Sequence, residues 1–99
     1  MCGAPDQDAL PALEVSQKEA VVHGTVSRAG SPLPGAYVRL LDGTGEFTAE
    51  VQTSATGYFR FYAAAGDWTL RTLAPGQVVD TPVTAAQGSA VEAALEVPA

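Results

Sequence analysis

The sequence has 99 residues and a hydrophobic content of 46%, which is enough for one domain with its own core and leaves no room for a second. Eleven acidic residues against five lysines and arginines give a net charge of −6, which excludes nucleic acid and anionic membrane surfaces as favourable partners. The single cysteine cannot form an internal disulfide, so the sequence favours the cytoplasm.

Residues 1–19 are predicted to form an extended or disordered N-terminal arm, and residues 20–99 a single folded domain. The arm contains Pro5 and Pro11, which oppose a helix, and its small and acidic residues show no sustained apolar period. Met1 is followed by no signal-peptide pattern, and the chain nowhere has about 18 consecutive apolar residues. The sequence as written therefore predicts neither export nor a membrane span.

From Val21 onwards, apolar and polar residues alternate with the period of two that indicates half-buried β-strands. Turn sequences rich in glycine and proline separate these runs, such as GSPLPG, DGTG and ATG. Pro82 cannot donate a hydrogen bond to a neighbouring strand, so the segment around it is expected to be an edge strand or a loop. The seven predicted strands cover residues 21–28, 36–41, 47–52, 58–62, 68–71, 78–83 and 91–97.

Short strands at this spacing, without a convincing helix, predict an all-β fold, a seven-stranded antiparallel Greek-key β-sandwich. The apolar side of each run gives the predicted core. Trp68 is expected at the centre of this core, near a sheet end, with a partner for its indole N–H. The other predicted core residues are Val22, Val26, Val38, Leu40, Phe47, Val51, Phe59, Phe61, Leu70, Val91, Leu95 and Val97.

Four short motifs resemble the carboxypeptidase regulatory-like, transthyretin-like β-sandwich domain. They are G-x-V in HGTV, P-x-x-G-A-x-V in PLPGAYV, T-x-x-x-G-x-F in TSATGYF, and P-G-x-[YW]-x-[LV] in AGDWTL, where Ala65 replaces the usual proline. Over nearly its full length, including the MCG start, the chain is more closely similar to the SseC-like family of small actinobacterial proteins of unknown function. This resemblance implies a transthyretin-like fold and, through frequent gene neighbourhood with rhodanese-type sulfurtransferases, a link to sulfur metabolism.

Cys2 is the chain's only cysteine and lies in the predicted arm. Removal of Met1 would place an α-ammonium beside its thiol, and that charge favours the nucleophilic thiolate. One hypothesis is therefore a persulfide carrier, or sulfurtransferase accessory, that accepts sulfur on Cys2. The alternatives are an incidental surface cysteine and a lipid-anchored envelope protein, because mature bacterial lipoproteins also begin with cysteine.

Three arginines, Arg39, Arg60 and Arg71, are predicted on outward strand faces beside tyrosines that include Tyr58 and Tyr62. One interpretation is a patch that binds an anion or the acidic surface of a partner, because guanidinium makes bidentate contacts with oxyanions. The other is a solvated face on which Arg60 and Arg71 pair with Glu50 or Glu92. The choice depends on whether the three arginines share one face without acidic neighbours.

Few residues of the predicted domain are suited to catalysis. One histidine and one cysteine in the whole chain give no metal-ligand set, so the sequence predicts neither a metal nor another cofactor. His23 is expected on the polar side of the first strand, where a solvated imidazole is the commoner outcome. The sequence therefore predicts a non-enzymatic protein-interaction module linked to sulfur metabolism. Its expected partner is a protein, with a rhodanese-like sulfurtransferase and a second copy of the chain, forming a homodimer, as the two candidates.

Overall fold

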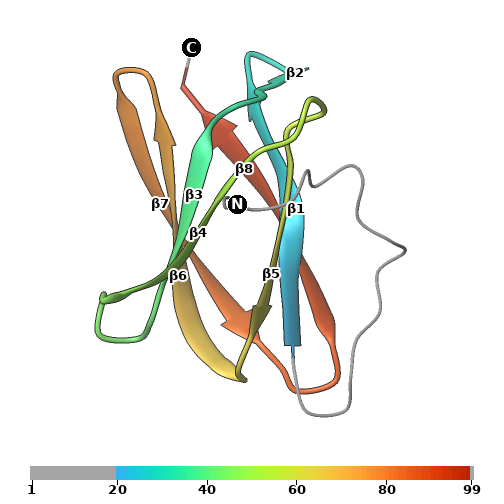
Figure 1. Cartoon of the computed structure of the whole chain (residues 1–99), viewed down its shortest axis with the longest axis vertical. Helices are drawn as coiled ribbons and strands as arrows, with labels where there is room; N and C mark the ends of the chain where they lie inside the picture. Colours follow the sequence, from blue (N-terminus) through green and yellow to red (C-terminus); the bar gives the residue numbers. More distant parts are fainter. Residues whose placement is uncertain (1–19, 99) are drawn as a thin grey trace, which may run out of the picture.

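Two four-stranded β-sheets make up the structure, a computed structural model that describes residues 20–98 (Figure 1). Within this range there is no helix, and so no helix that could cross a membrane. The strands are β1 (Ala20–Arg28), β2 (Ser31–Pro32), β3 (Tyr37–Leu41), β4 (Phe47–Gln52), β5 (Tyr58–Ala63), β6 (Gly66–Ala74), β7 (Gln77–Ala85) and β8 (Ala90–Val97). The predicted arm over residues 1–19 lies outside the described residues.

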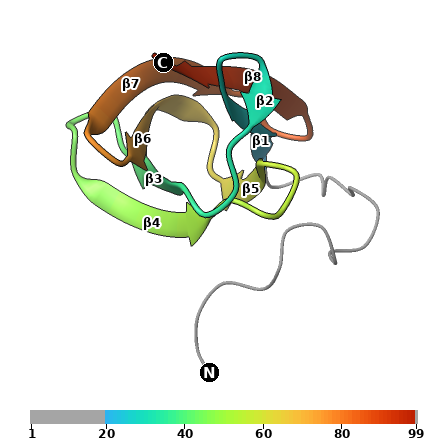
Figure 2. The ribbon, with the colours of Figure 1, turned by 90° about the horizontal axis from the view of Figure 1, so that it is seen from above.

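The two sheets pack face to face as a sandwich, and their edges approach each other so that the molecule looks almost closed when seen from above (Figure 2). In sheet A, β1 lies between β5 and β8, with the short β2 beside the end of β1. In sheet B the order is β4, β3, β6, β7. The predicted all-β sandwich is confirmed, and each of the seven predicted segments contains a strand.

Two features of the strand pairing were not predicted. The two-residue strand β2 pairs with the end of β1, and β8 pairs with β1 in parallel, whereas every other pair among the described strands is antiparallel. The chain reaches β8 by crossing from β7 in sheet B to sheet A, and this crossover lets β8 run in the same direction as β1. Alternation of polar and apolar residues carries no information about strand direction, so the sequence could not show this.

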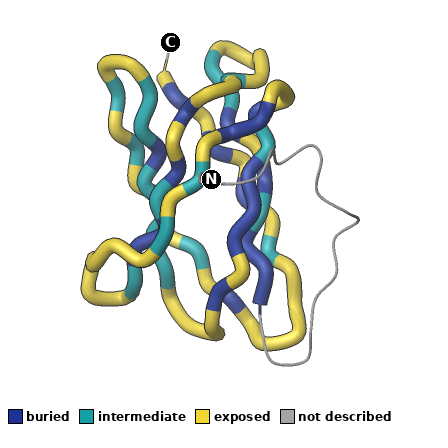
Figure 3. Tube along the Cα trace, in the orientation of Figure 1, coloured by how far each residue is buried: buried dark blue, intermediate teal, exposed yellow. Residues whose placement is uncertain are grey.

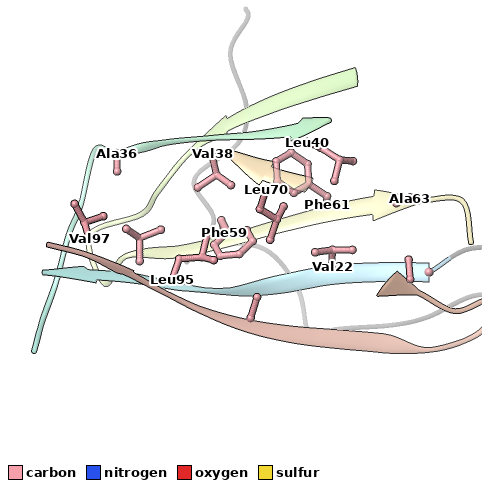
Figure 4. Packing of buried hydrophobic residues seen from close by; sticks show 14 residues of the cluster. Val22, Ala36, Val38, Leu40, Phe59, Phe61, Ala63, Leu70, Leu95 and Val97 are labelled. Carbon is pink, nitrogen blue, oxygen red and sulfur yellow. The ribbon is translucent and has the colours of Figure 1, made fainter. Parts of the chain in front are cut away.

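The core lies between the sheets and is formed by the inward-facing residues of the alternating runs (Figures 3 and 4). Phe59, Leu40 and Leu70 are among the largest side chains that are fully buried. Because each strand exposes alternate residues to one face, the period of two locates most of this core directly from the sequence. The predicted core residues found buried are Val22, Val26, Val38, Leu40, Phe59, Phe61, Leu70, Leu95 and Val97.

Trp68 is not at the centre of the core, where the sequence pattern predicted it. It is half-buried near the start of β6 and packs against the core from its edge, as do Val51 and Val91. Its indole N–H donates to the carbonyl oxygen of Ala64 over 2.9 Å, so the predicted need for a partner is met. The centre is instead filled by the shorter side chains of the middle strands, which interdigitate between the sheets.

Pro82 lies in an edge strand, as predicted, since β7 pairs only with β6 among the described strands. Pro82 faces Thr69 in the register of the two strands. Proline has no backbone N–H to donate. An edge strand tolerates this because one of its two sides has no hydrogen-bonded neighbour. The strand itself is longer than predicted and runs through Pro82 to Ala85.

Candidate functional site

The three candidate arginines do not form one patch. Arg39 on β3 and Arg71 on β6 are direct cross-strand neighbours on the outer face of sheet B, whereas Arg60 lies on β5 in sheet A. Alternation correctly predicted that Arg39 and Arg71 point outward. It could not show that Arg60 belongs to the other sheet, because sheet membership is a property of the topology. The three arginines therefore do not share one face, which was one condition of the patch interpretation.

Arg39 and Arg71 are each paired with an acid, so that one row of charges crosses sheet B. Arg39 Nε donates to Glu50 over 2.8 Å, and Arg71 donates to both carboxylate oxygens of Asp80 over 2.9 and 3.0 Å. The prediction that Arg71 pairs with Glu50 or Glu92 was wrong, because its partner is Asp80 and Glu50 pairs with Arg39. These groups are solvent-exposed, so each pair is expected to contribute less than about 1 kcal/mol.

The bidentate contact with Arg71 lowers the pKa of Asp80 below its ordinary value. The same hydrogen bond raises the pKa of the Arg71 guanidinium, so both groups stay charged. From β4 to β7 the charges follow the order acid, base, base, acid. The row is therefore neutral as a whole, and Arg39 and Arg71 have the acidic neighbours that the anion-binding interpretation of the sequence required to be absent.

On sheet A, the candidates Arg60, Tyr58 and Tyr62 lie on the outer side of β5. Arg60 is buried despite this position, and its guanidinium carbon lies 5.8 Å from the centroid of the Tyr62 ring. Tyr58 Oη lies 3.3 Å from Nδ1 of His23, and burial raises the pKa of Tyr58. His23 is half-buried rather than exposed as predicted, between Arg60 and Glu92 in the strand register.

Phe47 was predicted to be a core residue but is 60% exposed. Leu40 pairs with Ala49, whereas the next residue, Leu41, pairs with Phe47, so Thr48 is an extra residue in β4. Such a β-bulge reverses the side on which the preceding residue lies. Phe47 consequently faces outward, where the guanidinium carbon of Arg39 lies 5.9 Å from the centroid of its ring. A sequence pattern with a strict period of two cannot reveal a bulge.

Apolar side chains therefore flank the charged row of sheet B on both sides. On one side lies Phe47, and on the other Tyr37, Leu73 and Val78 occupy consecutive strands in register. Tyr37 is 45% and Val78 62% exposed. We call this surface the outer face of sheet B; it consists of Tyr37, Arg39, Phe47, Glu50, Thr69, Arg71, Leu73, Val78, Asp80 and Pro82. Tyr37 and Val78 were not among the predicted site residues, although alternation within their strands places both outward.

The loop between β3 and β4, at the lower end of this face in Figure 1, is ordered by one carboxylate. Asp42 Oδ1 accepts hydrogen bonds from the backbone N–H groups of Thr44 and Glu46 over 2.9 and 3.0 Å. It also accepts from the Thr44 hydroxyl over 2.7 Å, and this bond is the largest of the effects that lower the pKa of Asp42. The tight turn predicted from DGTG thus depends on an ionised aspartate.

The stabilising effect of Asp42 is expected to depend on pH. Its pKa is lower in the folded chain than in the unfolded chain, so its contribution is complete above the ordinary value of 3.8 and is lost as the pH falls through the folded value. Asp42→Asn should therefore lower the melting temperature at neutral pH and have less effect in acid, about one pH unit below that ordinary value. Thermal unfolding followed by circular dichroism under both conditions measures this difference, and an equal difference in both would contradict it.

Among the described residues, the remaining candidates from the sequence form no further functional site. Cys2 lies outside the described residues. Within residues 20–98, no group of three or more histidine, cysteine, aspartate or glutamate side chains is placed to hold a metal ion. Arg28, the fourth arginine on a strand, is separate from the outer face of sheet B and donates to the carbonyl oxygen of Pro75 over 3.4 Å.

Solved structures of other proteins share this fold at low sequence identity. The Bacillus anthracis TIE protein matches 83% of this chain with a TM-score of 0.72 and 17% identity, and the minor pilin GBS52 of Streptococcus agalactiae matches 83% with a TM-score of 0.70 and 17% identity. The chain spans only 17% and 45% of those two proteins. Catechol 1,2-dioxygenase from an Acinetobacter species matches 94% with a TM-score of 0.63 and 15% identity, and the chain spans 55% of it. These likenesses establish the β-sandwich fold alone.

Sequence relatives are much closer and occur in mycobacteria. The uncharacterized protein Rv0814c of Mycobacterium tuberculosis is 55% identical over 75 residues, which cover 74% of this chain and 75% of the relative. An uncharacterized protein of Mycolicibacterium smegmatis is 55% identical over 65 residues, or 65% of this chain and 72% of the relative. A family model described as a protein of unknown function, DUF1416, matches residues 2–97. The chain therefore belongs to the DUF1416 family, whose members include uncharacterized proteins of actinobacteria.

Proposed function

We propose that this protein is a non-enzymatic interaction module that binds a partner protein through the outer face of sheet B. The observation that carries the proposal is the exposure of three large apolar side chains, Tyr37, Phe47 and Val78, around a charged row on one sheet face. Exposed apolar side chains gathered on one surface and bordered by polar groups are typical of protein-binding sites.

The charged row suits a protein partner better than a small anion. Arg39 and Arg71 already have carboxylate partners, which neutralise their charge and repel an incoming anion. A partner protein can instead pack against Phe47 and Val78 and meet the neutral row with polar groups of its own. Apolar contact then supplies the affinity, and the fixed charges supply orientation.

Paired surface variants test this proposal. Phe47→Ser combined with Val78→Ser should reduce capture of the partner from an actinobacterial lysate at least about tenfold, because both side chains lose their apolar contact area. Tyr62→Ser is the matched control, since Tyr62 is 53% exposed on the opposite sheet. Captured proteins are identified by mass spectrometry, and thermal unfolding verifies that both variants remain folded.

The proposal fails if the double variant captures the same proteins as the wild type, or if Tyr62→Ser loses them equally. A second copy of the chain, forming a homodimer, is the alternative occupant of this face. Sedimentation velocity identifies it directly, because self-association of the wild type would then be lost in the Phe47 and Val78 double variant and kept in Tyr62→Ser.

The link to sulfur metabolism and a rhodanese-like partner remain predictions from the SseC-like resemblance, and a cytoplasmic location remains a prediction from the single cysteine. If Cys2 carries sulfur, incubation with thiosulfate and a rhodanese should add about 32 Da, and reductant should remove the addition. Cys2→Ser should prevent it. Intact mass spectrometry measures this gain, and an unmodified chain beside a sulfur-loaded rhodanese would reject the carrier hypothesis. A mass higher by a lipid would instead indicate the envelope-anchored alternative.

A further inference from the structure

The outer face of sheet A is buried around two residues, although it lies on the side of the sheet away from the core. Val21 of β1 is 0% and Arg60 of β5 is 6% exposed, and both alternate with core residues of their strands, so they point outward. The outward residues of β8 are all exposed. Burial on this face is therefore confined to part of β1 and β5, close to Ala20, where β1 begins. The residues of the face are Val21, His23, Thr25 and Ser27 of β1, Tyr58, Arg60 and Tyr62 of β5, and Ala90, Glu92, Ala94 and Glu96 of β8.

Neighbouring side chains of the sheet do not account for the burial of Val21. Side chains of a strand stand roughly perpendicular to the sheet, so cross-strand neighbours flank an outward residue and do not cover it. The neighbours of Val21 are Tyr62, which is 53% exposed, and Ala90, whose side chain is a single methyl group. The N–H of Val21 donates to the carbonyl oxygen of Ser89 over 3.0 Å, so the β7–β8 loop continues β8 in the plane of the sheet. Another segment must therefore lie over Val21.

The burial of Arg60 indicates what this segment contains. Among the described strands β5 pairs only with β1, and an outward arginine on such an edge strand usually extends its guanidinium into water. Arg60 is nevertheless almost fully buried. A guanidinium has five N–H donors, and its burial is stable where acidic or carbonyl groups accept from them. A segment over Val21 and Arg60 therefore combines apolar side chains with an acidic group.

The 19 residues that precede β1 include a stretch of this composition. Residues 8–15, DALPALEV, contain the apolar side chains Leu10, Leu13 and Val15, with Glu14 between the last two. Four residues separate Val15 from the start of β1, which is a usual length for a connection that reverses the direction of the chain. A stretch that returns along sheet A in this way first meets the sheet beside the first residues of β1, where the burial is found.

We propose that residues 8–15 of this chain pack on the outer face of sheet A, with their apolar side chains over Val21 and the carboxylate of Glu14 beside Arg60. One extended segment covers a strip one or two strands wide, whereas a second copy of the chain or a folded partner would also cover β8. The exposed outward residues of β8 therefore favour the chain's own segment. This inference goes beyond the proposed function: the chain closes part of sheet A itself and leaves the outer face of sheet B open to partners.

A protease that cleaves after glutamate tests the proposal on the full chain, because the Glu14–Val15 bond lies within the covering segment. Val21→Ser combined with Arg60→Gln should speed cleavage of this bond at least about tenfold, since the segment loses both of its contacts and opens more often. Phe47→Ser combined with Val78→Ser is the matched control on sheet B and should change the rate less than about twofold. Cleavage after Glu50, within β4, reports global unfolding in the same digest.

Nuclear Overhauser effects between methyl groups test the contact in the wild-type chain, without any substitution. The methyl groups of Val21 should show them to methyl groups of Leu10, Leu13 or Val15. Val38 is the internal control, because it is equally buried but lies in the core between the sheets, and it should show none to residues 8–15. If the methyl contacts of Val21 are all to residues 20–98, the proposal is rejected.

The remaining outcomes separate the other possible occupants and the proposed function. Wild-type cleavage after Glu14 that is as fast as in the Val21 and Arg60 double variant would reject the proposal. Protection of that bond that increases with protein concentration would assign the cover to a second copy and would also reject it. The Val21 and Arg60 double variant should still capture the partner that binds sheet B, so the two proposals can fail separately.

Discussion

Replacing Gly24 by alanine is expected to lower the free energy of unfolding by at least about 3 kcal/mol, a large part of the stability of a domain of this size. Gly24 lies in the middle of β1, between Phe59 of β5 and Ala93 of β8 in the strand register. A Cβ atom at this position would overlap the carbonyl oxygen of Ala93. The overlap is with backbone that is hydrogen-bonded within the sheet, so no side-chain rotation can relieve it.

Urea unfolding followed by Trp68 fluorescence measures this loss. Gly43→Ala is the matched control, since the nearest atom to its added Cβ, the carbonyl oxygen of Asp67, lies at an ordinary contact distance of 3.7 Å. That variant should stay within about 1 kcal/mol of the wild type. An unchanged urea midpoint for Gly24→Ala would show that β1 and β8 are not as close as the structure has them.

Gly57→Ala is expected to have the second-largest effect, because two costs combine at this position. Its φ of +76° lies in the left-handed region, which costs an alanine roughly 1 kcal/mol. In addition, its Cβ would lie 2.5 Å from the carbonyl oxygen of Val26 and 3.2 Å from the backbone nitrogen of Leu33. Those two atoms form a hydrogen bond of 2.9 Å with each other, which the new methyl group would disturb.

Gly30→Ala separates the two costs of the Gly57 substitution. Gly30 has a similar φ of +80°, but no described atom lies within 4 Å of the place that an added Cβ would take, so its substitution carries the backbone cost alone. The loss of unfolding free energy for Gly57→Ala should exceed that for Gly30→Ala by at least about 1 kcal/mol. Equal losses, measured by the same urea titration, would mean that the turn can move away from β1.

These positions explain why the motifs that carry the family resemblance are informative about fold and silent about activity. Gly24 belongs to G-x-V and Gly57 to T-x-x-x-G-x-F, and each lies where two backbones approach closely. The threonine of the second motif, Thr53, is buried; its hydroxyl accepts from the N–H of Ala36 over 2.9 Å and donates to the carbonyl oxygen of Leu33 over 2.8 Å. The motif residues thus connect β1, the turn before β3 and the turn before β5.

Only part of the candidate site could be predicted from the sequence. The outward positions of Arg39 and Arg71 follow from alternation, and both were predicted. Their acidic partners depend on which strands are neighbours, and the exposure of Phe47 depends on the bulge at Thr48. The β3–β4 loop lies beside the start of β6, with Gly43 near the carbonyl oxygen of Asp67, although the two segments are separated along the chain. None of these features is encoded in the period of a single strand.

The sandwich, the seven main strands, most of the buried core and the turns follow from the sequence alone, because they depend on local alternation and on glycine and proline conformations. Three features required the folded domain: β8 runs parallel to β1, Arg60 lies apart from Arg39 and Arg71, and Phe47 is exposed. The first two are consequences of pairing between segments distant in the chain, and the third is a consequence of the bulge between β3 and β4. Several pairings satisfy the same alternation, and the choice among them is made by packing of the whole domain.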